Sequence, residues 1–217
     1  MNNAIYSLHR PKNEPLLSYA PGTPERNELE KELKRLSSET IEIPLIINGK
    51  PVRTGQTGKV VMPHNHGHVL ATYHMAGEKE AGEATEAAMK AKESWMALSW
   101  VERASVMLKV AELLSKKYRH TIVAATMLGQ SKSVQQAEIE AAGETIDFLR
   151  FNSYFAGQIY EEQPGSEPDQ LNRVEYRPLE GFVYTITPFN FTAIASNLNM
   201  SVALMGNTTV WKPTCSD

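Results

Sequence analysis

The segment that most constrains the fold lies between Gly181 and Pro213. It begins with an apolar run, GFVYTIT, which has the length of a β-strand and is rich in β-branched and aromatic residues. Pro188 ends this run, Thr192 can cap a following helix, and Gly206-Asn207 supplies a helix stop before a second strand, TTVWK. This order predicts a βαβ unit, the minimal part of a doubly wound nucleotide-binding sheet. The apolar helix positions predict a buried or half-buried face made by Ile194, Leu198, Val202, Leu204 and Met205.

Asn190 stands just beyond the carboxyl end of the first predicted strand, where open α/β sheets bind ligands. A side-chain amide there can donate a hydrogen bond to an oxygen that becomes negative in a transition state, typically worth about 3 kcal/mol. The residues alone leave another interpretation open, because Asn in such a position is more often a turn former or a helix cap. The unit also lacks the GxGxxG turn that marks many dinucleotide-binding sheets.

Composition restricts the class of protein. The net charge is −3, with 22 Lys and Arg against 25 Asp and Glu, so nothing favours nucleic acid or an anionic membrane as a partner. No apolar run approaches the roughly 20 residues that a membrane-spanning helix needs. A single cysteine excludes an internal disulfide, and residues 1–15 have neither a secretory nor a transit-peptide pattern. We expect a cytoplasmic protein, or a mitochondrial matrix protein if the source is eukaryotic.

The first half of the chain predicts an extended arm, a helix and a hairpin. Four prolines punctuate residues 1–24, and a charged helix follows over residues 24–36, with i,i+3 and i,i+4 pairing between its acidic and basic residues. The sequence IEIPLIINGKPVRT predicts a hairpin that turns at Asn48-Gly49. We expect the next stretch, MPHNHGHVLATYHMA, to be irregular and then to enter a strand.

Helices dominate the middle of the chain. Two long helices are expected over residues 78–117, with Ser99 capping the second. We expect three residues before that cap to face the core: Trp95, Met96 and Leu98. Two further helices are expected over residues 121–155, broken near Gly129 and Ser131. Residues 157–181 then alternate around a Pro-Gly-Ser-Glu-Pro-Asp turn, which predicts a hairpin, although a solvated loop is an open alternative.

Three motifs of the last segment occur together and in register: Pro188-Phe189-Asn190-Phe191, Ala203-Leu204-Met205-Gly206-Asn207 and Lys212-Pro213. In these motifs, and in the 22 positions between Asn190 and Lys212, the chain resembles the aldehyde dehydrogenase superfamily. Longer stretches resemble its delta-1-pyrroline-5-carboxylate dehydrogenase branch: residues 13–26, 126–152 and 176–183. The helix departs from the usual pattern at Asn199-Met200 and Ser201-Val202, which puts its packing in question.

The resemblance implies an α/β fold of the aldehyde dehydrogenase type. Residues 1–156 would form an arm, a hairpin and helices of the NAD-binding region. Residues 157–181 would form a hairpin that bridges subunits of a homo-oligomer. Residues 182–217 would form the first βαβ part of the NAD-binding sheet, cut off before a catalytic domain.

The resemblance also implies roles for individual residues. Asn190 would stabilise the oxyanion, and Lys212 would bind the adenosine ribose of NAD. The nicotinamide side would be lined by Thr187, Pro188 and Phe189. Phe191 would form an aromatic wall of the aldehyde site, although a place in the hydrophobic core is an equally open interpretation. Glu144 would lie near the substrate tunnel, where an acid suits an amino-bearing substrate, although Glu138, Glu140 and Glu144 together are also consistent with a solvated helix face.

The implied activity is NAD-dependent oxidation of L-glutamate 5-semialdehyde, in equilibrium with 1-pyrroline-5-carboxylate, to L-glutamate in proline degradation. In such enzymes a thiolate attacks the aldehyde, a hydride passes to NAD, and the thioester is hydrolysed. Cys215 follows the last strand by two residues and does not match the nucleophile's Gly-Gln-x-Cys context. We therefore expect the nucleophile and the general-base glutamate outside these 217 residues. Two alternatives remain: another aldehyde dehydrogenase branch, and a short non-catalytic binding or assembly partner.

Four histidines invite a metal-site interpretation, since HxHxH can place imidazoles on one face of a strand. They are His64, His66, His68 and His74. However, the segment PHNHGHV resembles a family element without a metal function, and no acid or cysteine completes a local ligand set. We expect no metal here.

Overall fold

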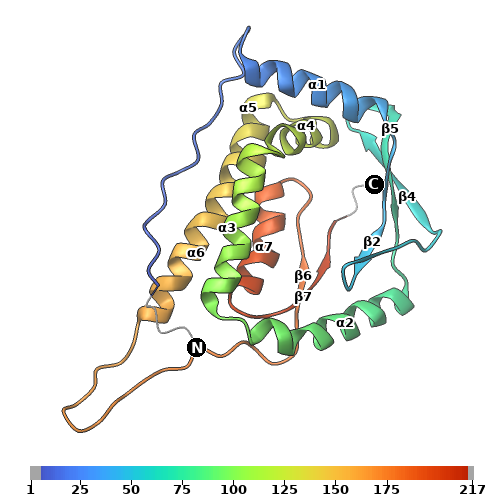
Figure 1. Ribbon diagram of the computed structural model, residues 1–217. Coiled ribbons are helices and arrows are strands. Elements are labelled where there is room, and N and C mark those ends of the chain that lie inside the picture. The colour runs from blue at the N-terminus through green and yellow to red at the C-terminus, as the bar shows by residue number, and fades with distance from the viewer. Residues whose placement is uncertain (1–5, 215–217) are drawn as a thin grey trace.

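The protein has an α/β structure in which most helices pack together and the strands of the described residues form three small sheets (Figure 1). The computed structural model describes residues 6–214. Its helices are α1 (Pro24–Ser38), α2 (Glu78–Met96), α3 (Trp100–Lys116), α4 (Arg119–Gln130), α5 (Val134–Ala137), the π-helical segment η1 (Glu138–Glu144), α6 (Thr145–Glu161) and α7 (Thr192–Leu204). Its strands are β1 (Ile41–Ile43), β2 (Leu45–Ile47), β3 (Lys50–Val52), β4 (Thr57–Met62), β5 (Asn65–His74), β6 (Val183–Ile186) and β7 (Thr209–Lys212).

The hydrophobic core lies among the helices. Helices α3, α6 and α7 lie side by side and α1 packs against α4 (Figure 1). Small residues let these helices approach closely, since alanines and a few large side chains fill the centre. The fully or largely buried apolar residues of this cluster are Tyr19, Leu29, Leu36, Ala104, Met107, Ala111, Val123, Ala124, Ala137, Ala142, Ile146, Leu149, Ala156 and Leu204.

The predicted helices of the first two thirds are present. The ion pairs expected on α1 form, with Glu28 bound to Lys31 and Glu32 to Arg35, both at 2.6 Å. Ser99 caps α3 as predicted, in a reciprocal capping box with the residue three positions later. The break near Gly129 and Ser131 is also confirmed.

The prediction that Trp95, Met96 and Leu98 all face the core is wrong at Met96. Trp95 packs against the core and Leu98 is half-buried, but Met96 is 38% exposed. It is the last residue of α2, and neighbouring positions of a helix point in directions about 100° apart, so Trp95 and Met96 do not share a face.

The strands after α1 are more extensive than predicted. Strands β2 and β3 form the expected antiparallel hairpin, and Asn48 and Gly49 both have positive φ, as a tight hairpin turn requires. The strand predicted within MPHNHGHVLATYHMA is present as β5, but it begins at Asn65 and leaves little of the expected irregular part. It pairs antiparallel with β4, and Met62 lies opposite Asn65. Strand β1 pairs in parallel with β5. Ladder hydrogen bonds override the low strand propensity of the His, Asn and Gly residues that begin β5.

The predicted βαβ unit is confirmed. Strands β6 and β7 are parallel, with Val183 opposite Thr209 and Ile186 opposite Lys212. Helix α7 ends in a Schellman motif, in which the Gly206 N–H donates to the Ala203 carbonyl and the Asn207 N–H to the Val202 carbonyl. Gly206 has a φ of +87°, which few other residues adopt at low cost.

The predicted inner face of α7 is confirmed at Leu204, which is buried, and at Val202 and Met205, which are half-buried, but it is wrong at two positions. Ile194 and Leu198 are 41% and 40% exposed, whereas Ala193, Asn199 and Leu204 are buried. Ile194 and Leu198 are apolar, but within the described residues no other element buries them.

Asn199, where small residues are common in the family, is accommodated by hydrogen bonds. Its side-chain oxygen accepts from the Thr185 hydroxyl at 2.6 Å, and its NH₂ donates to the Ala195 carbonyl at 3.0 Å. A buried amide with both ends paired avoids the penalty of an unsatisfied polar group. This departure from the family pattern therefore joins α7 to β6 instead of disturbing their packing.

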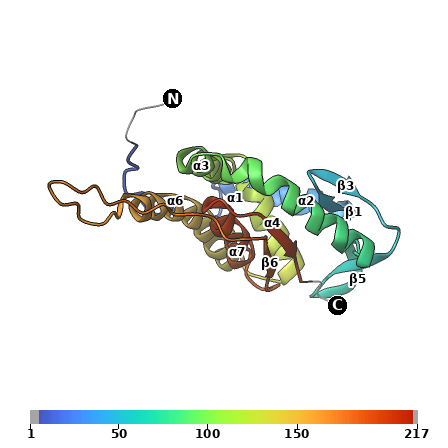
Figure 2. The same ribbon diagram turned by 90° about the horizontal axis from the view of Figure 1, so that it is seen from below.

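The segment after α6 leaves the body of the molecule and returns to it (Figure 1 and Figure 2). Helix α6 continues to Glu161, so this excursion covers residues 162–181 and begins later than the predicted residue 157. It contains one isolated antiparallel bridge, between Glu167 and Gln170, and no named strand. Side chains close its base instead, since Gln163 bonds the backbone N–H and carbonyl of Val174.

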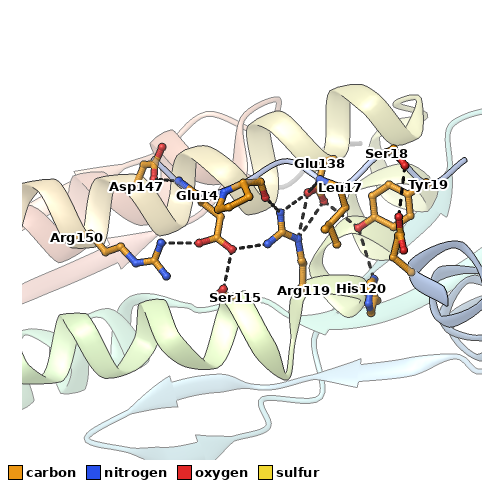
Figure 3. A network of polar contacts seen from close by, with 12 residues as sticks. Glu14, Leu17, Ser18, Tyr19, Ser115, Arg119, His120, Glu138, Asp147 and Arg150 are labelled. Atoms are coloured by element: carbon orange, nitrogen blue, oxygen red, sulfur yellow. Dashed lines mark hydrogen bonds and ion pairs between the residues drawn. The ribbon is translucent and has the colours of Figure 1, made fainter. Parts of the chain in front are cut away.

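An N-terminal strap, residues 13–19, is bound to the helices by a buried ionic network (Figure 3). Arg119, at the start of α4, forms ion pairs with Glu14 of the strap and with Glu138 of η1, and all three side chains are at most 6% exposed. Arg119 also donates to the Pro15 carbonyl at 2.6 Å. The guanidinium thus joins the strap, α4 and η1 at one point.

Further hydrogen bonds fix the rest of the strap. Glu138 accepts from the Leu17 N–H at 2.8 Å and from the Tyr19 hydroxyl at 2.9 Å (Figure 3). Burial, and then the negative charge of Glu138, raises the pKa of Tyr19, which keeps its hydroxyl protonated as a donor. Tyr19 has a φ of +51°, a left-handed conformation that costs about 1 to 2 kcal/mol in a non-glycine residue. The buried hydrogen bond offsets part of that cost.

We expect Arg119→Met to lower the free energy of unfolding by about 3 to 5 kcal/mol, because it leaves the Glu138 carboxylate buried without its cation. Glu14 loses one of its two cations and keeps the other, Arg150. Urea denaturation measures this loss. Arg35→Met is the matched control, since it removes an exposed pair with Glu32 and should leave the unfolding free energy nearly unchanged. Equal losses in the two variants would contradict the special weight of the buried pair.

Candidate functional site

The turn after β6 is fastened to β7. Thr187 is 2% exposed, and its N–H donates to the Lys212 carbonyl at 3.3 Å, one residue beyond the last paired position of β6. The indole N–H of Trp211 donates to the Thr187 hydroxyl oxygen at 2.9 Å. This hydroxyl is therefore held at the carboxyl edge of two parallel strands, the edge at which such sheets bind ligands.

Asn190 lies in this turn, and its backbone carbonyl is held by a neighbouring side chain. The Asn190 carbonyl accepts a hydrogen bond from the ammonium of Lys132. The residue is exposed, and within residues 6–214 its carboxamide has no hydrogen-bond partner. Both amide hydrogens are therefore available to a bound molecule, as an oxyanion donor requires.

The helix that follows the turn is capped from a distant part of the chain. Glu140 of η1 is 4% exposed, and its carboxylate accepts from the N–H of Thr192 and, at 3.4 Å, from that of Ala193. These are the first residues of α7, whose amides have no partner within the helix. The negative charge also complements the positive end of the helix dipole.

The prediction that Thr192 caps α7 is therefore wrong. Thr192 is the first helical residue, and no side-chain cap is made by the N-cap residue, Phe191. The Thr192 hydroxyl instead lies 3.5 Å from that of Thr126 on α4. A carboxylate 52 residues earlier supplies the acceptor that a local hydroxyl was expected to provide.

Lys132 connects the capping carboxylate with the turn. Its ammonium lies 2.9 Å from the Glu140 carboxylate, donates to the Asn190 carbonyl, and stands 4.3 Å from the centre of the Phe191 ring. A cation at this distance over an aromatic face is attracted to it. Sequence analysis did not identify Lys132 as a site residue. The one sequence feature that points to it is its position in the short connection between α4 and α5, where the predicted helices break.

The acidic cluster of η1 is not a solvated face. Glu138 and Glu140 are 2% and 4% exposed, and Glu144 is half-buried. Burial raises the pKa of Glu144 above its ordinary value, the negative charge of Glu140 raises it further, and Lys132 opposes both effects. The charges of Glu140 and Lys132, which hold the Asn190 turn, therefore both influence the Glu144 carboxyl.

The remaining predicted site residues are accessible. Lys212 is exposed at the end of β7, and it makes no ion pair with any residue between 6 and 214. Phe189 is 64% exposed, Phe191 37% exposed, and Pro188 half-buried. The chain thus presents an amide, an ammonium and aromatic rings around one sheet edge. Cys215 lies outside the described residues.

Two of the four histidines, His64 and His74, contact different parts of the chain. His64 lies 2.7 Å from the Ser131 hydroxyl, at the end of α4. His74 is buried, 3.0 Å from Glu42, and accepts a hydrogen bond from the Gly55 N–H at 3.2 Å. Across residues 6–214 no group of three or more His, Cys, Asp or Glu side chains is placed to hold a metal ion. No helix in the same range has the length and apolar character needed to cross a bilayer.

Fold and site together describe an α/β protein with exposed polar and aromatic side chains at the carboxyl edge of a parallel strand pair. A sequence profile of the aldehyde dehydrogenase family matches residues 52–216. The chain therefore belongs to the aldehyde dehydrogenase family, and the resemblance read from its motifs is confirmed.

Individual relatives define the similarity more narrowly. The chain is 48% identical over 212 residues to the delta-1-pyrroline-5-carboxylate dehydrogenase of Agaricus bisporus, which covers 97% of this chain and 39% of that protein. It is 46% identical over 208 residues to the mitochondrial delta-1-pyrroline-5-carboxylate dehydrogenase of Dictyostelium discoideum, covering 95% of this chain and 37% of that protein. The chain thus spans about two fifths of the length of the curated relatives it matches.

A solved structure confirms the predicted fold class. The delta-pyrroline-5-carboxylate dehydrogenase of Mycobacterium tuberculosis, determined with bound NAD, superimposes with a TM-score of 0.96 at 52% sequence identity. The match covers 98% of this chain and 40% of that one.

We expect two substitutions to move the pKa of Glu144 in opposite directions. Glu140→Gln removes a negative charge that disfavours the Glu144 carboxylate, so the pKa should fall toward its ordinary value of 4.5. Lys132→Met removes the opposing positive charge, so the pKa should rise further. A carbon-detected NMR titration of the Glu144 carboxyl measures both shifts. Lys31→Met, on the far surface of α1, should change nothing, and shifts of the same sign in the two test variants would contradict the arrangement.

Proposed function

We propose that the chain is part of an NAD-dependent dehydrogenase that oxidises L-glutamate 5-semialdehyde, in equilibrium with 1-pyrroline-5-carboxylate, to L-glutamate in proline degradation. The observation that carries this proposal is the similarity over 97% of the chain to delta-1-pyrroline-5-carboxylate dehydrogenase. The free carboxamide of Asn190 beside a parallel strand edge supports it independently. The proposal assigns the thiol nucleophile and the general base of this chemistry to another part of the enzyme.

The strand edge fits the adenosine side of NAD. The exposed ammonium of Lys212 can donate to ribose hydroxyls or to phosphate, and it is not engaged by a carboxylate within residues 6–214. Thr187 offers a positioned hydroxyl, and Pro188 and Phe189 offer apolar surface on the nicotinamide side. When bound, NAD accepts the hydride of the oxidation.

Asn190 acts on the aldehyde oxygen. As that oxygen gains negative charge, the carboxamide donates a hydrogen bond that is stronger in the transition state than in the ground state. Phe191, next to it, forms an aromatic wall of the aldehyde site. Glu144, with its raised pKa and its position close to Lys132, interacts with the amino-bearing end of the substrate.

We further propose a homo-oligomer in which the excursion is the bridging arm. It exposes Leu171 and Leu179 by 74% and 63%, which an apolar partner surface would cover. Because α6 continues to Glu161, the chain then divides into residues 1–161 for the NAD-binding region and 162–181 for the arm, in place of the predicted 1–156 and 157–181. Residues 182–217 form the first βαβ part of the NAD-binding sheet. The location is the cytoplasm, or the mitochondrial matrix if the source is eukaryotic, since the Dictyostelium discoideum relative is mitochondrial.

In the complete enzyme, Asn190→Ala should lower kcat by about 10²- to 10³-fold, as expected for loss of an oxyanion donor. Binding of NAD should change little, because the carboxamide contacts the substrate oxygen and not the cofactor. Steady-state kinetics, together with calorimetric titration of NAD, measure the two effects. Near-normal turnover in this variant would refute the oxyanion role.

Lys212→Ala should have the opposite signature. The KM for NAD should rise while the reactivity of the thiol nucleophile is retained, because the lost contact is to the cofactor. Calorimetric titration of NAD and the rate of thiol alkylation measure these properties. An unchanged NAD dissociation constant would exclude the ribose contact.

A further inference from the structure

We propose that Lys132 and Glu140 form a positioning pair that fixes the direction in which the Asn190 carboxamide points. This inference rests on the proposed oxyanion role of Asn190 and adds two residues to it. Neither residue of the pair is assigned a contact with substrate or cofactor, so both act through the turn.

The pair contacts three consecutive residues of the chain. Lys132 donates to the carbonyl of Asn190 and lies over the ring of Phe191, and Glu140 accepts from the N–H of Thr192. The pair is closed on itself by the 2.9 Å contact between the Lys132 ammonium and the Glu140 carboxylate. The backbone that follows the Asn190 side chain is thus bound to the pair at two points, the Asn190 carbonyl and the Thr192 N–H.

The Asn190 turn needs these backbone contacts because the Asn190 side chain makes no hydrogen bond that would orient it within residues 6–214. The Asn190 carboxamide has no hydrogen-bond partner within residues 6–214, so only the backbone determines where it points. A donor that stabilises a transition state has to be placed before the reaction, and a displacement of about 1 Å can cost on the order of 100-fold in rate. Backbone contacts are therefore the means by which this amide is preorganised.

Both members of the pair are themselves held in place. The side chains of Lys132 and Glu140 are 17% and 5% exposed, so solvent screens their attraction weakly. Lys132 lies between two helix ends: Ser131, with a φ of +53°, ends α4 and bonds His64, while Ser133 caps α5 in a reciprocal box. The connection between α4 and α5 therefore places the Lys132 ammonium against the turn that contains Asn190.

A double-mutant cycle in the complete enzyme tests the proposal. Lys132→Met should lower kcat by about 10- to 100-fold with little change in the KM for NAD. In an enzyme that already carries Asn190→Ala, the same substitution should have almost no further effect, because no carboxamide remains to be positioned. Lys31→Met, which removes an exposed lysine of α1, is the matched control and should leave kcat unchanged.

Two outcomes would overturn the inference. An unchanged kcat in Lys132→Met shows that the pair does not position Asn190, even if Asn190→Ala itself is strongly impaired. An equal fall in kcat in the presence and absence of Asn190 shows that the lysine acts by another route. Failure of the proposed function is distinct from both, since it appears as normal turnover in the Asn190→Ala variant alone.

Glu140→Gln keeps the test decisive if Lys132→Met does not fold. Glutamine retains an acceptor for the first amides of α7 and nearly the same volume, but loses the charge that holds Lys132. We expect a smaller fall in kcat that also disappears in the Asn190→Ala background, with a melting temperature close to that of the parent enzyme. A fall that persists in that background contradicts the proposal.

Discussion

Two buried carboxylates of the π-helical segment η1 hold the beginning and the end of the described chain to the same turn of helix. Glu138 binds Arg119 and through it the N-terminal strap, whereas Glu140 binds Lys132 and the start of α7. Residues two positions apart leave a helix on nearly opposite sides, so the two carboxylates serve different neighbours. Each carries a buried negative charge that is stable only with its cation and its hydrogen bonds. The packing of α4, α6 and α7 around η1 therefore depends on satisfying both.

The predictable parts of the structure are those that local chemistry determines. Local sequence signals determine these parts, because each signal lies within a few residues of the structure that it forms. They are the helical periodicity, the Ser99 cap, the Asn48-Gly49 turn and the βαβ order. The Glu140 cap of α7 is not determined in this way, because its two halves lie 52 residues apart and only the tertiary fold joins them. The exposure of Ile194 shows the same limit, since an apolar face indicates that contact is favourable but not which element provides it.

The candidate site, like the fold, was predictable where local motifs define it and not where distant residues support it. Its residues were read from motifs at the end of the chain, and the structure gathers Asn190 and Lys212 at one strand edge as the βαβ order requires. The residues that support the turn were missed because they carry no motif. Lys132 is an ordinary lysine in sequence, and Glu140 belongs to a run of acids that is indistinguishable from a solvated helix face until its burial is known. Supporting contacts of this kind are visible only in three dimensions.

The N-terminal strap has a consequence for the order of folding. Its ion pair between Glu14 and Arg119 closes a loop of 105 positions, and closing such a loop costs on the order of 4 kcal/mol of chain entropy. Helix pairs that are near in sequence assemble without that cost and form first. At a synthesis rate of about 5 to 20 residues per second, the arginine is made roughly 5 to 20 seconds after the glutamate. We therefore expect the strap to remain unattached during synthesis and to dock onto helices that have already formed.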